Sequence, residues 1–159
     1  MNETGPPPPI QPGGMFDDIR LSAVLLGVLV DTAATVLGSL VLLSAFMSRD
    51  GREPSDEVLR ELSATPEFLL ASLVVGLMCT VLGGYVGARR ANRAHVRHGA
   101  WIAVGSALFG LAQFAVAAPG APTPPLWFDL VGFSLMIPAG AGGGLLARVA
   151  SRPAARGPS

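Results

Sequence analysis

Apolar residues occur along this chain in four long runs, at positions 21–47, 68–88, 99–118 and 130–147. Each run holds about 18 residues or more, and a helix that rises about 1.5 Å per residue then crosses a hydrocarbon core of about 30 Å. A soluble bundle of this size would give most of its helices a polar face. The pattern predicts an all-α integral membrane four-helix bundle over residues 18–150, with spans at about 20–47, 66–90, 98–118 and 125–149.

The connection between the first two runs is charged and has a helical pattern of its own. Ser55 is a good helix-capping residue, and Val58 and Leu62 follow on one side of a helix whose other side is acidic. This pattern predicts a short amphipathic helix that lies on the membrane surface. Thr65 and Pro66 then predict the start of the second span, because Thr caps helices and Pro is favoured in their first turn.

The arginines indicate which way the spans run. Four spans place residues 1–17, the connection between the second and third runs, and residues 151–159 on one side of the membrane. Because cytoplasmic segments carry the excess of basic residues, this side is predicted to be the cytoplasm and the amphipathic helix to be extracellular. Residues 1–17, which include four consecutive prolines, are predicted to be a disordered Pro-rich cytoplasmic tail. Residues 151–159 are predicted to be a short second cytoplasmic tail. The arginines on this side are Arg20, Arg89, Arg90, Arg93, Arg97, Arg148, Arg152 and Arg156.

Composition narrows the functional classes. The net charge is zero, so a nucleic-acid partner is not expected. The single Cys79 excludes an intramolecular disulfide and a cysteine-based zinc site. The chain has no recognisable catalytic or phosphate-binding motif, so we expect a non-enzymatic protein without metal or cofactor. All its basic residues are arginine, which is typical of a GC-rich bacterial genome and favours the bacterial cytoplasmic (inner) membrane.

Asp31 is the one charged residue inside the first run, and keeping a carboxyl group within a membrane span costs free energy. Counted from the cytoplasmic end, it lies about 14 Å deep at ~1.5 Å per residue. Antiparallel spans bring Thr80 and Pro138 to a similar depth, and Pro138 leaves the carbonyl of Ser134 without its helical donor. The sequence thus predicts an intramembrane polar cluster of Asp31, Thr35, Thr80, Ser134 and Pro138.

Three interpretations of Asp31 remain open. The carboxyl group could bind a proton or another cation during ion-coupled transport. It could instead be protonated and donate a hydrogen bond that fixes one helix to another. In the third interpretation it faces a partner subunit.

Small residues follow one face of each predicted span, among them Gly27 in the first, Gly84 in the second, Gly110 in the third and Gly140 in the fourth. In lipid, small residues let helix backbones approach one another, so these faces are predicted to pack. The second and fourth spans also end alike, with glycines followed by Ala-Arg. This similarity suggests two helical hairpins related by duplication.

The connection between the second and third spans is strongly basic. Arg89, Arg90, Arg93 and Arg97 are expected to face the cytoplasmic leaflet, where they can contact anionic lipid headgroups. Two histidines in the same connection make a poor metal site, since they supply only two ligands.

The segment that begins Gly83-Gly84-Tyr85 and continues through Arg89 to His98-Gly99 resembles a loose group of small bacterial inner-membrane proteins. These proteins have about four spans and a Gly-Gly-Tyr-x-x-x-Arg…His-Gly signature, and most are uncharacterised. The resemblance implies a membrane location and no specific activity.

Two functions are consistent with these features. The first is an accessory or scaffold subunit that acts through helix–helix contacts, in a homo-oligomer or a larger membrane complex. The alternative is a small proton- or ion-coupled transporter or channel that works as an oligomer, with Asp31 as its titrating group.

Overall fold

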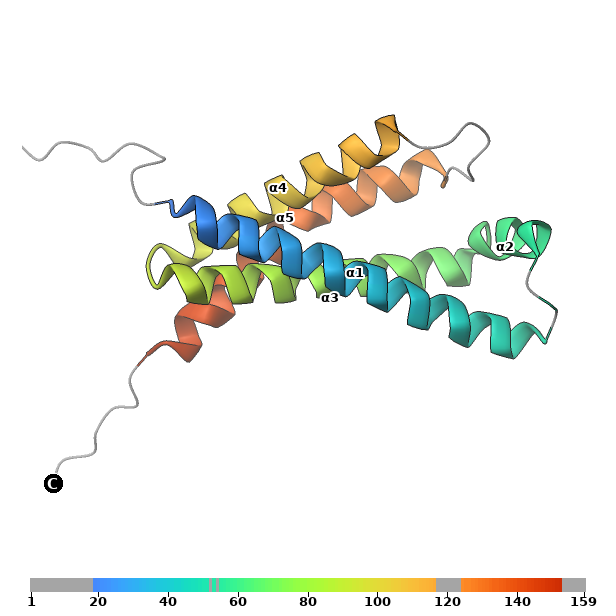
Figure 1. The fold of residues 1–159 in the computed structure, drawn as a ribbon, viewed down its shortest axis with the longest axis horizontal. Coiled ribbons are helices and arrows are strands. Elements are labelled where there is room, and N and C mark those ends of the chain that lie inside the picture. Colours follow the sequence, from blue (N-terminus) through green and yellow to red (C-terminus); the bar gives the residue numbers. More distant parts are fainter. Residues whose placement is uncertain (1–18, 52, 54, 117–123, 153–159) are drawn as a thin grey trace, which may run out of the picture.

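The computed structural model describes residues 19–51, 53, 55–116 and 124–152. This part of the chain contains five helices and no strand. The four long helices run alternately in opposite directions, and the short α2 lies at one end of the molecule (Figure 1). Residues 1–17 lie outside the described part, as does the second predicted tail beyond residue 152. The helices are α1 (Leu21–Asp50), α2 (Asp56–Ser63), α3 (Pro66–Ala91), α4 (His95–Ala115) and α5 (Leu126–Ala150).

Three of these helices, α1, α3 and α5, are long and apolar enough to cross a membrane. Large apolar side chains are exposed along α1, such as Leu29 at 66% and Val41 at 70%, as expected where lipid is the solvent. The described part of the chain is therefore all-helical, as predicted, and three of its helices could span a membrane. The fourth predicted span, α4, is not among the three: its first turn holds His95, Arg97 and His98, and the described helix ends before residues 117–123.

Local signals explain where the helices begin and end. The hydroxyl of Ser55 accepts a hydrogen bond from the backbone N–H of Val58 at 3.3 Å, and that of Thr65 accepts one from Phe68 at 3.4 Å. The predicted amphipathic helix is therefore present as α2, with Val58 buried and its acidic side exposed. The first helix continues past its apolar run to Asp50 and ends at Gly51, whose φ of 72° suits glycine.

Glycines bring α3 and α5 into backbone contact. A Cβ atom built on Gly84 of α3 would lie 2.5 Å from the carbonyl oxygen of Gly140 in α5, and one built on Gly143 of α5 would collide with the carbonyl oxygen of Val81 in α3. Both contacts lie within one helical turn, so the backbones of α3 and α5 approach each other closely there.

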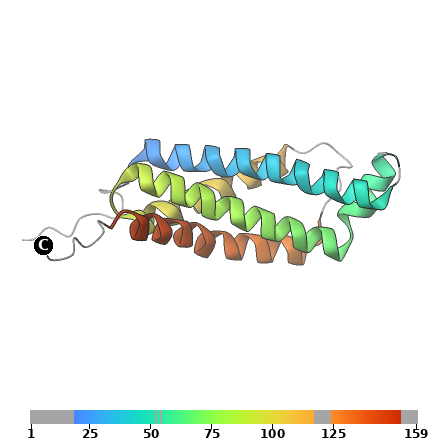
Figure 2. The same ribbon diagram turned by 90° about the horizontal axis from the view of Figure 1, so that it is seen from below.

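The helices pack tightly at one end only. Near the turn between α3 and α4, Ala88, Ile102, Ala103 and Ala147 are fully buried. Toward the end that holds α2, the α4–α5 hairpin diverges from the α1–α3 hairpin (Figure 1). A view turned by 90° shows α1, α3 and α5 side by side in that order, each running along the long axis (Figure 2).

Candidate functional site

A cavity of about 380 Å³ occupies the space between the diverging hairpins. All four long helices line it, and each contributes about two turns. The residues from α1 are Asp31, Thr32, Thr35, Val36 and Ser39, and those from α3 are Ser72, Leu73, Gly76, Leu77 and Thr80. The residues from α4 are Ser106, Phe109, Gly110 and Gln113, and those from α5 are Phe128, Asp129, Gly132, Phe133 and Met136.

The buried end of the cavity is polar. Asp31 is 3% exposed, Thr80 2% and Ser106 7%. The Oδ1 atom of Asp31 and the Oγ atom of Ser106 have no hydrogen-bond partner among the described residues. The hydroxyl of Thr80 donates its proton to the carbonyl oxygen of Gly76 at 3.1 Å, so its oxygen can still accept a hydrogen bond. Two buried oxygens without partners are costly unless another group binds them.

A glycine lets Asp31 occupy this position. A Cβ atom on Gly83 of α3 would lie 2.7 Å from the Cβ of Asp31, so any larger residue would push the two helices apart. The hydroxyls of Ser106 and Thr80 neighbour the Asp31 carboxyl from α4 and α3. The polar end is therefore built by three helices around one carboxyl group.

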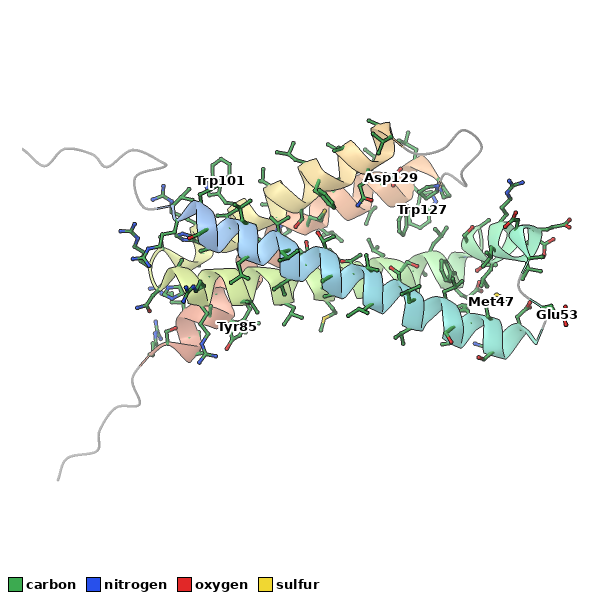
Figure 3. All side chains as sticks on the ribbon, in the orientation of Figure 1. Met47, Glu53, Tyr85, Trp101, Trp127 and Asp129 are labelled. Carbon is green, nitrogen blue, oxygen red and sulfur yellow. The ribbon has the colours of Figure 1, made fainter. Side chains whose placement is uncertain are left out.

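The rest of the cavity changes from aromatic to polar along its length. Phe109 and Phe133 come next after the buried end, and Ser39, Gln113 and Asp129 lie at the open end. From Asp31 to Ser39 the helix rises roughly 12 Å at ~1.5 Å per residue. Figure 3 shows Asp129 near the start of α5, at the end where the hairpins diverge.

The cavity lining carries two carboxyl groups and no basic residue. Asp31 and Asp129 lie toward its two ends, whereas no Arg or His is among the lining residues that the structure describes. A cavity with this charge attracts cations and repels anions.

The structure brings together part of the predicted polar cluster. Asp31, Thr35 and Thr80 all line the cavity, but Ser134 and Pro138 do not. Ser134 is exposed and donates its hydroxyl proton to the carbonyl oxygen of Leu130 at 2.6 Å, and Pro138 is exposed as well. The reason is rotational: α5 turns Gly132, Phe133 and Met136 toward the cavity, which places residues 134 and 138 on its outer face.

The sequence analysis did not identify Ser106, Gln113 or Asp129 as members of a site, and all three line the cavity. Gly110, which was assigned to a packing face, has no atom within 4 Å of a built Cβ and lines the cavity, and the same holds for Gly76. The helical spacing of Ser106, Gly110 and Gln113 places these three residues on one face of a helix. The spacing does not indicate whether that face packs against another helix or lines a cavity.

The predicted basic connection lies at the tightly packed end of the molecule. Arg89 and Arg90 are in the last turn of α3, Arg93 follows in the turn, and Arg97 is in the first turn of α4; all four are exposed. The guanidinium of Arg89 donates to the hydroxyl of Tyr85 at 2.9 Å and lies 5.9 Å from its ring centre. In the described part of the chain, no three His, Cys, Asp or Glu side chains gather as metal ligands.

The chain matches no protein family profile, and neither a curated protein nor a solved structure is significantly similar to it. Its function must therefore be inferred from the cavity and from the physical chemistry of the residues that line it.

Proposed function

We propose that this chain is a small bacterial inner-membrane protein that binds a cation or a proton at Asp31 and carries it across the membrane, without enzymatic activity. The observation behind the proposal is the unpartnered carboxyl oxygen of Asp31 at the buried end of a cavity lined by four helices. Because one copy of the chain supplies the whole lining, the binding site does not depend on an oligomer interface.

The free-energy cost of burying an unpaired carboxyl oxygen supports a ligand-binding role for Asp31. A structural Asp would be expected to use its oxygens in hydrogen bonds to the helices around it, since an unpaired buried polar group is destabilising. Asp31 instead has a buried carboxyl oxygen without a hydrogen-bond partner among the described residues, and the residue lines a cavity large enough for a small molecule. Ionisable groups within membrane spans that face a cavity commonly mark ion pathways.

The proposal includes a topology in which α4 is a fourth span and both termini are cytoplasmic. Support comes from charge: Arg89, Arg90 and Arg93 are at the tightly packed end, and the acidic α2 is at the end where the cavity opens. The cavity would then open to the outside. The four arginines at 89, 90, 93 and 97 would meet the anionic cytoplasmic leaflet.

Transport can be tested on purified protein in liposomes. A gradient of protons, Na⁺ or K⁺ is imposed, and flux is followed with an internal fluorescent indicator for each ion. We expect flux that Asp31→Asn abolishes, because Asn keeps the size of the side chain and removes its charge. Asp56→Asn, the same change in the exposed first turn of α2, is the matched control and should leave the flux unchanged.

An accessory or scaffold subunit is the second candidate, and one contact favours it. Asp31 lies directly against Gly83, beside Thr80, where a protonated carboxyl could hold α1 to α3. This function predicts a stoichiometric partner when the protein is purified from its native membrane in mild detergent, and partner binding that survives Asp31→Asn. Ion flux that depends on Asp31, with no partner present, would exclude it.

A further inference from the structure

We propose that the natural ligand of the cavity is a primary ammonium ion that carries an aromatic or similarly bulky apolar group. This inference rests on the proposed cation site and names the class of cation. It follows from three features of the cavity: the oxygens at its buried end, the aromatic side chains along its length, and the charge at its mouth.

The oxygens at the buried end match a donor-rich head group. Asp31 Oδ1 and Ser106 Oγ have no hydrogen-bond partner among the described residues, and the Thr80 hydroxyl can accept because its proton is already donated to Gly76. A primary ammonium ion has three N–H donors, one for each of these oxygens. A quaternary ammonium ion has no N–H donor, and a proton on Asp31 supplies a single donor, which can serve only one of the two neighbouring hydroxyl oxygens.

The next part of the cavity suits an apolar body. Phe109 of α4 and Phe133 of α5 line it beyond the polar end, and Phe128 lines it closer to the mouth. Aromatic rings bury apolar surface and also attract a nearby cation through their faces. An inorganic ion would use the oxygens and leave this aromatic part of the cavity empty.

The mouth favours cations over anions. Asp129 and Gln113 lie there, and no basic side chain is among the described lining residues. The Asp129 carboxylate would raise the local concentration of cations and repel acids. A ligand would therefore enter with its ammonium group first and end with that group at Asp31.

Calorimetric titration of the full chain in lipid nanodiscs tests the ligand class with four probes that share one apolar body. The probes are phenethylammonium, phenethyltrimethylammonium, phenethyl alcohol and hydrocinnamate. We expect phenethylammonium to bind most tightly, and the trimethyl ion and the alcohol to bind at least about ten-fold more weakly, because each lacks either the donors or the charge. Hydrocinnamate should show no binding. Equal affinity for the alcohol or for the trimethyl ion would overturn the proposal.

Variants place the ligand in the cavity. Ser106→Ala should weaken phenethylammonium binding about ten-fold, as expected for the loss of one hydrogen bond to a charged group. Ser134→Ala makes the same change on the outer face of α5 and should leave the affinity unchanged. Asp31→Asn should abolish binding. If it also lowers the melting temperature, the Ser106→Ala and Ser134→Ala pair decides the question, and equal affinities in that pair overturn the proposal.

Failure of this inference can be told apart from failure of the proposed function. If the protein shows Asp31-dependent flux of protons or Na⁺ but does not bind phenethylammonium, the proposed cation transport is supported and the proposed ammonium ligand is contradicted. Phenethylammonium binding without any Asp31-dependent flux, its own uptake into liposomes included, would keep the ligand class and reject transport. Absence of both would reject both.

Discussion

The buried ring of His98 accepts a hydrogen bond at 3.0 Å from the backbone N–H of Arg20, a residue 78 positions earlier in the chain. The other ring nitrogen of His98 lies 3.2 Å from the carbonyl oxygen of Ala94, one helical turn back. With Nε2 as an acceptor, Nδ1 carries the proton and donates it to Ala94. The side chain of α4 thus satisfies one of the free N–H groups at the start of α1, which has no side-chain cap of its own.

Replacing this histidine should loosen the start of α1. His98→Ala removes the acceptor for the Arg20 N–H and leaves a cavity where the ring was fully buried. We expect a loss of about 1–3 kcal/mol in the free energy of unfolding, as for other buried donors left without a partner. Thermal melting of the purified protein in detergent measures the loss of stability. Hydrogen exchange at the first turn of α1 shows whether the loss is located there. Unchanged exchange there would show that the hydrogen bond contributes little.

The contact between α4 and α5 within their hairpin should be sensitive to a single methyl group. A Cβ at Gly140 would lie 2.5 Å from the carbonyl oxygen of Gly99 and 2.7 Å from the Cβ of Ala103. Gly140→Ala should therefore destabilise the fold by about 1–3 kcal/mol through overpacking. Gly142→Ala is the matched control on the same helix, because nothing lies within 4 Å of a Cβ there. We expect the control to melt at or above the temperature of the wild type, whereas equal loss in both variants would point to a general effect of alanine.

The topology predicts opposite sides for α2 and the end of α5. In a Cys79→Ser background, Ser63→Cys and Ser151→Cys each provide one thiol. With four spans, a membrane-impermeant maleimide should label Ser63→Cys in intact cells and Ser151→Cys only after lysis. If α4 does not cross the membrane, α5 runs the other way and the two thiols react from the same side. The experiment therefore tests the fourth span and the orientation together.

Water should reach the cavity between the hairpins. Gly110 lines it, and a built Cβ there meets nothing within 4 Å, so Gly110→Cys fits without strain. A thiol in contact with water ionises and reacts with a charged methanethiosulfonate, whereas one in lipid does not. Gly142→Cys has equal space but lies outside the cavity, so we expect it to react at least about ten-fold more slowly. Phenethylammonium should slow the reaction at Gly110→Cys, and equal rates at both positions would show that the cavity is closed to water.

Features that depend on neighbouring residues were predictable from the sequence. The lengths of the apolar runs predicted α1, α3 and α5, and the hydroxyls of Ser55 and Thr65 predicted where α2 and α3 begin. The proximity of Thr80 to Asp31 was predictable too, because antiparallel helices of known rise place the two residues at the same level. These relations involve only helical geometry and residues within a few positions of one another.

Rotation and separation of the helices were decided by the tertiary structure. The sequence placed Ser134 and Pro138 at the depth of Asp31, but the close contact of Gly140 with Gly84 and Gly99 turns their side of α5 outward. Because this contact lies at one end of the molecule only, the hairpins diverge at the opposite end. Gly110 therefore lines a cavity and does not pack against a helix. Helical periodicity defines faces, but which face meets which neighbour depends on where two backbones can approach, and that is a property of both helices at once.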